Sequence, residues 1–180
     1  LVDLGAMFSL LDQPIEVKDK DGALPLVISN ARVEFRNVNF SYNKGREILN
    51  NFSLSLCKGD QIAIVGSTGS GKSTIARLLF RFYDPDKGFI LIDDQKLIDL
   101  HQGSIHQNVG IIPQDTVLFN DTILYNIKYG NQASSFDQII SASRDAGIED
   151  FVSALPEGYQ TLVGERGLKL SGGEKQRIGI

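Results

Sequence analysis

The sequence predicts an α/β fold, and two observations support this prediction. Residues 66–74 read GSTGSGKST, which fits the pattern G-x-x-x-x-G-K-[S/T]. An apolar run rich in β-branched residues precedes the pattern at 62–65, and residues 75–82 follow it with apolar side chains at helical spacing. A strand, a glycine-rich loop and a helix in this order form the context in which the pattern binds phosphate. We therefore expect an α/β core arranged around a phosphate-binding loop.

The residue types of this loop suit an anion. Its glycines allow a tight curl that turns backbone N–H groups inward, and the helix that begins here adds its positive dipole end. Lys72 can reach the β- and γ-phosphates of a nucleotide, and the Ser73 hydroxyl can bind Mg²⁺. The alternative, a glycine-rich turn without a ligand, does not explain the flanking strand and helix. We expect nucleotide contacts from Gly66, Ser67, Thr68, Gly69, Ser70, Gly71, Lys72, Ser73 and Thr74.

The composition of the chain argues against several classes of protein. The chain has 180 residues, of which 42% are hydrophobic and 22% charged, as in an ordinary globular protein with one core. A net charge of −4 gives no reason to expect a nucleic-acid partner. The single Cys57 rules out an internal disulfide, and no apolar run approaches the roughly 18 residues of a membrane helix. Because the chain starts with leucine and ends within an apparent helix, we expect it to be a piece of a longer protein.

A lead-in segment and two strands are expected before the loop. Apolar residues at helical spacing predict a short helix over 1–11, and the polar stretch 12–25 is typical of a linker. Strands are expected at 31–42 and 51–57. The second alternates strictly between polar and apolar residues, which is typical of a half-exposed antiparallel strand.

Two further strands are expected after the loop and its helix. The first covers 89–92 and follows a turn at 84–88, and the second covers 109–112 and is stopped by Pro113.

Helical signals dominate from Asp121 onward. Asp121 is placed to cap the first of these helices, Ser134 or Ser135 to cap the second, and Gly147 to end it. The expected helices cover 122–129, 134 or 135 to about 146, and 148–155.

A second motif, LSGGEKQR at 170–177, lies near the end of the chain. Ser171 as the N-cap and Glu174 three residues later form a capping box, which explains a helix start. Capping does not explain Gly172 and Gly173 in the first turn, where glycine weakens a helix. Two glycines would let backbone N–H groups approach a phosphate closely.

Together the two motifs resemble those of ATP-binding cassette (ABC) ATPases. Residues 66–73 are similar to the Walker A motif of that family and 170–177 to its signature motif, and the resemblance covers about 31 to the end. It implies a P-loop NTPase core with an antiparallel β-subdomain before it and a helical subdomain at about 114–170. It also implies ATP and Mg²⁺ as cofactors. In the family, two such domains pair head to tail, so Ser171, Gly172, Gly173 and Glu174 would meet the nucleotide bound by the other copy.

Three further residues receive roles from this resemblance. Tyr42 resembles the A-loop aromatic residue that stacks on adenine, although an aromatic residue in a strand core is the alternative. Gln114 resembles the Q-loop glutamine, which approaches Mg²⁺ and the attacking water, and is assigned to catalysis together with Lys72. Glu165 resembles the X-loop glutamate of exporters, so we expect the membrane domain to contact the chain near Glu165 and Gln114. A solvated loop charge is the alternative for Glu165.

The stretch FILIDD at 89–94 looks like a Walker B motif but stands in the wrong place. Walker B follows the signature in ABC ATPases, so the resemblance assigns Asp93 to a turn after an ordinary strand. The true Walker B aspartate and the glutamate that serves as general base are expected beyond Ile180. The longer protein should therefore hydrolyse ATP, this segment alone should not, and the C-terminal part of the core should be missing from it.

The branch of the family is indicated by residues 111–123, IIPQDTVLFNDTI, which resemble B-type exporters of the mitochondrial iron–sulfur and heavy-metal-tolerance branch. These exporters move glutathione-linked compounds. Residues 4–12 resemble the tail of a last membrane helix, so 1–30 are assigned to that tail and a linker, and 31–180 to the ABC domain. The resemblance implies ATP-driven export, with the domain at the cytoplasmic face of a bacterial inner membrane or the matrix face of a mitochondrial one.

Two other functions remain open at this point. A soluble ABC ATPase of translation or DNA repair would carry no membrane domain, although Lys72 and Leu170 are too close in sequence for the long coiled coil of the repair proteins. A nucleotide-binding switch that never hydrolyses ATP would lack the glutamate after Walker B.

Overall fold

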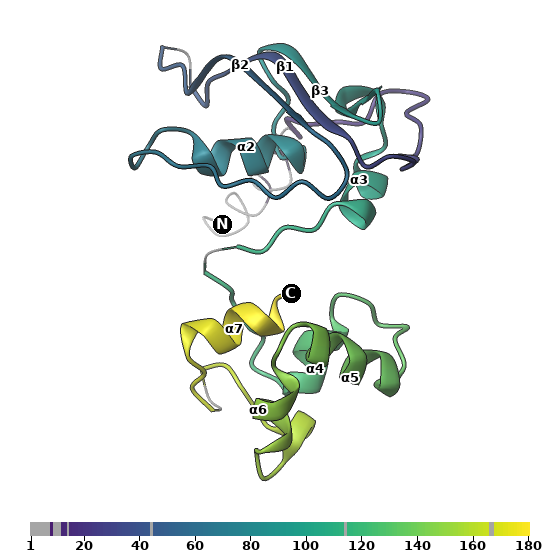
Figure 1. Cartoon of the computed structure of the whole chain (residues 1–180), viewed down its shortest axis with the longest axis vertical. Helices are drawn as coiled ribbons and strands as arrows, with labels where there is room; N and C mark the ends of the chain where they lie inside the picture. The colour runs from purple at the N-terminus through teal and green to yellow at the C-terminus, as the bar shows by residue number, and fades with distance from the viewer. Residues whose placement is uncertain (1–7, 9–11, 14, 44, 114, 166–167) are drawn as a thin grey trace. The chain divides into compact units, whose positions relative to one another are not determined.

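The computed structural model describes residues 8, 12–13, 15–43, 45–113, 115–165 and 168–180. The chain divides into two compact units, Leu1–Ile111 and Ile112–Ile180, and Figure 1 labels their main elements. The elements of the first unit are β1 (Val33–Phe40), β2 (Leu49–Leu56), α2 (Lys72–Leu79), β3 (Lys87–Ile92), β4 (Gln95–Lys96), η1 (Leu97–Asp99) and α3 (Gln102–Asn108). Those of the second unit are α4 (Ile123–Lys128), α5 (Phe136–Asp145), α6 (Glu149–Ser153), η2 (Gly158–Gln160) and α7 (Gly172–Ile178).

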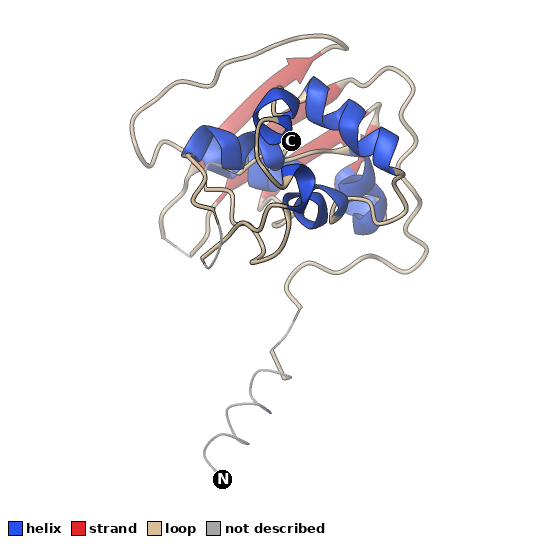
Figure 2. Ribbon diagram, turned by 90° about the horizontal axis from the view of Figure 1, so that it is seen from below, coloured by secondary structure: helices blue, strands red, loops and turns tan. Residues whose placement is uncertain are grey.

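The first unit is built on one antiparallel sheet with the strand order β2-β1-β3-β4. The strands of the sheet are red in Figure 2. A register shift between Phe35 and Val38 interrupts the alternation of β1, so that Phe35, Val38 and Phe40 all lie in the core, where each is 3% exposed or less. Helix α2 packs against the same core through Ile75 and Leu78, and Figure 1 shows it beside the sheet. The phosphate-binding loop is thereby joined directly to a buried helix.

The second unit is helical and has a smaller core of its own. Ser135 begins α5 with a full capping box to Gln138, and Gly147 ends that helix region with a φ of 67°. The buried residues of this core are Ile123, Ile148, Val152, Val163, Leu170 and Ile178. Val163 and Leu170 come from the loop segment before α7, so the core also fixes the chain on which the second motif begins.

Two predicted strands do not form, and the prediction is wrong at 62–65 and 109–112. Ile62, Ile64 and Val65 are 49%, 41% and 88% exposed, although they were expected to be buried. A strand needs a neighbour to take its backbone hydrogen bonds. Within the part of the chain that is described, no ladder reaches either segment. In addition, β3 follows the phosphate-binding loop but pairs with β1, so the antiparallel sheet does not lie wholly before the core.

Helix boundaries differ from the predictions in two helices, α4 and α6. Thr122 rather than Asp121 caps α4, because the Thr122 hydroxyl accepts from the backbone N–H of Tyr125 at 3.0 Å. The Asp121 carboxylate instead accepts from the N–H of Thr122 at 2.7 Å. Helix α6 is shorter than expected, Glu149–Ser153. The helix expected over 1–11 lies outside the described residues except for Phe8. Among the described residues, no helix has the length and apolar character that a membrane crossing requires.

Candidate nucleotide-binding site

The phosphate-binding loop is closed by the lysine at the start of α2. The Lys72 ammonium donates to the carbonyl oxygens of Gly66 and Ser67, both at 2.8 Å. A turn bond from the N–H of Ser70 to the carbonyl of Ser67 at 3.2 Å tightens the same loop. The fixed cation therefore lies against the residues predicted to surround phosphate. Ser73, the predicted Mg²⁺ ligand, is exposed in the first turn of α2.

Glycine is required at the point where the loop enters the helix. Gly71 is the N-cap of α2 and has a φ of 92°, a left-handed conformation that costs other residues energy. A Cβ on Gly71 would lie 3.0 Å from Leu49 Cδ2 and 3.2 Å from Ile48 Cγ2. The left-handed backbone and the lack of room for a Cβ thus both explain this glycine. Ile48 and Leu49 pack against the loop at this point.

Tyr42 lies at the same end of α2, as expected of a residue that contacts the nucleotide. Its ring packs edge-on against Phe40 and Tyr83, with centroids 4.9 Å and 5.1 Å away. Its hydroxyl is 3.1 Å from Thr74 Oγ1 and accepts a bond from Arg77 at 3.2 Å. The ring remains 37% exposed. The structure therefore brings Tyr42 and Thr74 together, and a base could stack on the exposed part of the ring.

Sequence reasoning missed Arg77 and Tyr83, which hold the Tyr42 ring. Arg77 lies three residues after Thr74, on the same face of α2, and that spacing was the available signal. The hydrogen bond that Arg77 donates to the Tyr42 hydroxyl raises the pKa of Arg77 above its usual value, so the guanidinium stays charged. Nothing in the sequence pointed to Tyr83, because its contact with Tyr42 depends on the tertiary fold.

The second motif starts α7 with the capping box that the sequence predicts. The Ser171 hydroxyl accepts from the N–H of Glu174 at 3.3 Å, and the Glu174 carboxylate accepts from the N–H of Ser171 at 2.7 Å. No described atom would lie within 4 Å of a Cβ on Gly172, beyond the helix itself and the adjacent residues, and its φ is not positive. The fold itself gives no reason for glycine here, and Ser171, Gly172 and Gly173 are exposed. The space above this turn is therefore open to a group from outside the unit.

The predicted site residues fall into two sets. Residues 66–74 and Tyr42 belong to the first unit, whereas Ser171, Gly172, Gly173, Glu174 and Glu165 belong to the second. Glu165 is exposed and borders a depression that Thr116, Lys169 and Lys175 also line. Gln114 lies outside the described residues, so its predicted role stays a prediction.

Asp93 occupies the turn after β3, as the sequence analysis expected, and its carboxylate is fully engaged there. It accepts from the backbone N–H groups of four consecutive residues, Ser29, Asn30, Ala31 and Arg32, at 2.6 to 3.1 Å. These backbone hydrogen bonds, that from Arg32 foremost, lower the pKa of Asp93 well below its usual range. Asp93 therefore holds the lead-in segment. Within the described ranges, no cluster of three or more His, Cys, Asp or Glu side chains could hold a metal ion.

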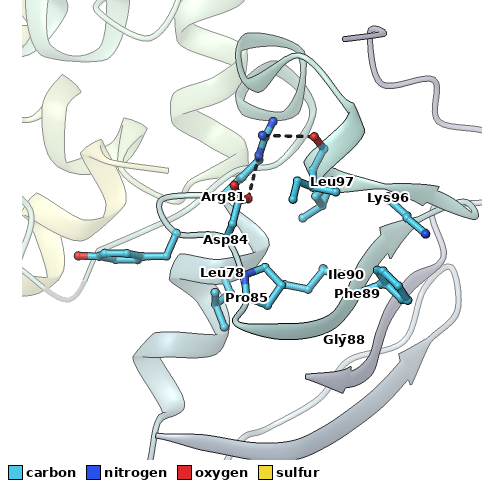
Figure 3. Close-up of a pocket in the computed structure, with 11 residues that line it drawn as sticks. Leu78, Arg81, Asp84, Pro85, Gly88, Phe89, Ile90, Lys96 and Leu97 are labelled. Carbon is cyan, nitrogen blue, oxygen red and sulfur yellow. Dashed lines mark hydrogen bonds and ion pairs between the residues drawn. The ribbon is translucent and has the colours of Figure 1, made fainter. Parts of the chain in front are cut away.

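The pocket in Figure 3 lies elsewhere in the first unit and contains none of the predicted phosphate-binding residues. It opens between the residues that follow α2, the first half of β3 and the start of η1. The Lys96 ammonium lies 3.8 Å from the centre of the Phe89 ring, a cation–π contact. At the other side, Arg81 and Asp84 are joined by a hydrogen bond of 3.1 Å.

Comparison with known proteins identifies the family. Residues 49–180 match the family model described as ABC transporter, and the chain belongs to this family of transport ATPases. It is 54% identical, over its full length, to the ATM1-type heavy metal exporter of Novosphingobium aromaticivorans, of which it covers 30%. It is 53% identical over 99% of its length to human ATP-binding cassette sub-family B member 6, covering 21% of that protein. The human mitochondrial iron-sulfur clusters transporter ABCB7 is 48% identical over 100% of the chain, which covers 24% of it.

A solved structure agrees with these relatives. It is the structure of a bacterial Atm1-family ABC exporter with ATP bound, which is 53% identical to this chain and superimposes on it with a TM-score of 0.92. The match covers 99% of this chain and 31% of the exporter chain. The chain is thus, in part, an ABC nucleotide-binding domain similar to those of Atm1-type exporters, which confirms the predicted α/β fold, family and branch. It spans less than a third of the length of these relatives. ABC transporters bind ATP and hydrolyse it, so a nucleotide site is expected on this chain.

Proposed function

We propose that the protein containing this chain hydrolyses ATP to drive export of a compound across a membrane, and that this chain supplies the nucleotide-binding surface. The observation that carries the proposal is the Lys72 ammonium, which lies inside the loop 66–71 at 2.8 Å from two of its carbonyls. A cation held there can exchange carbonyl oxygens for phosphate oxygens without a change in the backbone. The Atm1-type relatives support export as the use of that ATP.

The site fits ATP and Mg²⁺ on the residues present. Gly71 gives the loop the left-handed conformation with which it enters α2, Lys72 would neutralise the charge of a phosphate, and the exposed part of the Tyr42 ring would stack on the base. The Ser73 hydroxyl and the Gln114 side chain would hold Mg²⁺, which supplies further charge neutralisation at the phosphates. Gln114 would also orient the water that attacks, so we assign it to catalysis with Lys72.

The second set of residues would complete the site of a second copy. Ser171, Gly172, Gly173 and Glu174 form an exposed helix start with free space above Gly172. We propose that these residues contact the nucleotide that the loop of a partner domain holds, in a head-to-tail dimer. Neither surface alone would surround the terminal phosphate, so closure of the dimer would depend on ATP.

The membrane domain would contact the helical unit near Glu165 and Gln114. Glu165 is exposed, and on the same unit Phe119, Tyr125 and Tyr129 form a cluster of rings that are 47%, 42% and 54% exposed. Exposed aromatic clusters of this kind are characteristic of protein interfaces. We propose that the chain lies at the cytoplasmic face of a bacterial inner membrane or the matrix face of a mitochondrial one.

We propose the same domain limits as the sequence suggests. Residues 1–30 would be the tail of a membrane helix and a linker, and 31–180 the ABC domain with its helical subdomain at about 114–170. The division between Ile111 and Ile112 supports the start of that subdomain.

The test uses the full-length exporter in inside-out membrane vesicles, with glutathione disulfide as the transported probe. We expect uptake of the probe to require ATP and to stop in Lys72→Ala, with Lys58→Ala as an exposed control. ATP hydrolysis without any ATP-dependent uptake would contradict export of this class of compound. Nucleotide binding with no hydrolysis would instead favour the non-hydrolysing switch.

A further inference from the structure

The segment before β1 is hydrogen-bonded along its length to the rest of the first unit, although it was expected to be a linker. We call residues 18–32 the strap. Leu24 pairs with the segment around Leu100 through bonds of 3.2 and 2.8 Å, to the Asp99 carbonyl and from the His101 N–H. Further along, Leu26 is buried, and its N–H donates to Ser104 Oγ at 2.8 Å.

Two side chains fix the second half of the strap. The Gln95 amide brackets Val27, accepting from its N–H at 3.2 Å and donating to its carbonyl at 2.6 Å. Asp93 then gathers the four N–H groups of 29–32. The strap therefore has one register on the unit, and a shift by one residue would break all of these bonds together.

The first half of the strap is held by Arg81, a fully buried charge. Its side chain is 0% exposed and makes five hydrogen bonds. On the strap it donates to Asp19 Oδ1 at 3.2 Å and to the Lys18 carbonyl at 3.2 Å. The other acceptors are Asp84 Oδ1 and the carbonyls of Leu100 and Ile98, at 3.1, 2.6 and 3.4 Å. The bond to Asp84 is visible in Figure 3.

Arg81 is also fixed to the helix that carries the phosphate-binding residues. It follows the last residue of α2, Leu79, by two positions, and its N–H donates to the Leu78 carbonyl at 3.0 Å. Its own carbonyl accepts from Gln102 Nε2 at 2.8 Å. A helix of this length extends about 12 Å. Helix α2 thus joins the segment that Arg81 anchors to Lys72 at its other end.

We propose that Asp19 and Arg81 form a joint through which the chain preceding residue 18 positions α2, and with it the phosphate-binding loop. The inference rests on the proposed function, because only a nucleotide site gives that position a use. An apolar contact could hold a helix against a strap equally well, since a buried ion pair contributes little net stability. A guanidinium bound to one carboxylate and one carbonyl of the strap instead fixes direction and distance. Arg81 thus acts as a positioning residue.

Coupling between two sites is reciprocal, so ATP binding at α2 must also change the strap. The experiment measures amide hydrogen exchange in the full-length exporter with and without ATP, at the loop 66–74 and at the strap residues 20–24. In the wild type we expect ATP to slow exchange in both segments. In Asp19→Ala the loop should still be protected, whereas the strap response should fall by about fivefold or more. Asp19 is chosen because its side chain is 29% exposed and because Arg81 keeps four other hydrogen bonds without it. The change also removes the acceptor of the Gln102 N–H at 3.0 Å and the contact of 3.5 Å with His101 Nε2.

Two variants serve as controls. Lys18→Ala keeps the carbonyl that Arg81 uses and should respond as the wild type does. Asp19→Glu retains the carboxylate and should restore most of the strap response, which a loss of packing alone would not predict. An unchanged strap response in Asp19→Ala, or a wild-type strap that ignores ATP while the loop is protected, would overturn the joint. A wild-type loop that shows no protection by ATP would overturn the proposed function itself, and the joint with it.

Discussion

The Lys72 ammonium donates to two carbonyl oxygens of its own loop, so a positive charge is already held at the place where a phosphate would bind. We predict that Lys72→Ala lowers the ATP affinity at least tenfold, because a hydrogen bond to a charged group is worth about 1.5–3 kcal/mol. Titration calorimetry of the full-length exporter measures this directly. Lys58→Ala, an exposed lysine of a turn outside the loop, should bind ATP as the wild type does. Equal affinities for the two variants would remove Lys72 from the site.

Substitution of two glycines by alanine should have different effects, one on stability and the other on dimer formation. Gly71→Ala should lower the free energy of unfolding by about 1–3 kcal/mol, because a φ of 92° strains alanine and the new Cβ would lie 3.0 Å from Leu49. Gly172→Ala should leave stability unchanged or raise it by up to about 1 kcal/mol, because alanine favours a helix more than glycine does and no described neighbour lies within 4 Å of that Cβ outside its own helix and adjacent residues. It should nevertheless weaken the ATP-dependent dimer. Thermal unfolding and analytical ultracentrifugation with ATP distinguish the two effects, and a tight dimer in Gly172→Ala would count against an external contact there.

Asp93 makes the stability of the first unit depend on pH in the acid range. Four backbone N–H groups lower the folded-state pKa of this carboxylate, so its contribution is present above the unfolded pKa, near 4. The contribution is lost as the pH falls from about 5 towards the folded pKa. We predict that the thermal midpoint drops less in Asp93→Asn than in the wild type between pH 6 and pH 3. Parallel curves for the two proteins would show that the N–H cluster does not select the charged form.

Helix α5 begins at one of two adjacent serines, and the structure selects the second. The Ser135 hydroxyl accepts from the Gln138 N–H at 3.3 Å, and the Gln138 side chain accepts from the Ser135 N–H at 2.9 Å. We predict that Ser135→Ala costs about 1 kcal/mol of stability, as the loss of an N-cap does. The neighbouring Ser134→Ala is the matched control and should change stability by less than about 0.5 kcal/mol. Denaturant titration measures both, and equal costs would mean that the cap is assigned to the wrong residue.

At the level of elements, short local patterns predict more of the structure than long-range pairings do. The start of α2 and the capping box of α7 depend on residues close in sequence, so their patterns predict them. The cap of α4 is an exception, because it lies at Thr122, one residue after the predicted Asp121. The segments 62–65 and 109–112 have strand composition, but a strand forms only where a neighbour pairs with it. The sequence predicts a linker at the strap because its partners, such as Gln95 and Ser104, lie 68 and 78 residues away from the residues they bind.

The site divides in the same way. The loop 66–74 and the helix start at Ser171 were predictable, because each is a short motif with a fixed spacing. The supports of Tyr42 were not, since Tyr83 and Arg77 reach it only through the packing of α2 against the sheet. Nor was the buried Arg81, whose sequence neighbours give no indication that its charge would be enclosed.

For the whole molecule, we propose that each ATP site takes the loop 66–74 from one copy and the helix start at Ser171 from another. The two sets of residues lie in different compact units, and each presents an exposed surface. A site shared between copies has a consequence that a site within one copy does not have. Damage to the loop of one copy and to the turn of the other should leave one complete site in a mixed dimer.

The decisive measurement is therefore ATP occlusion by mixed dimers of the full-length exporter, one half carrying Lys72→Ala and the other Ser171→Arg. Each variant paired with itself should hold almost no ATP, because both of its sites are damaged. The mixed dimer should recover about half of the wild-type occlusion, since its undamaged loop faces its undamaged turn. If the mixed dimer holds as little ATP as the two parents, the loop and the turn do not act across the pair, and the head-to-tail account is contradicted.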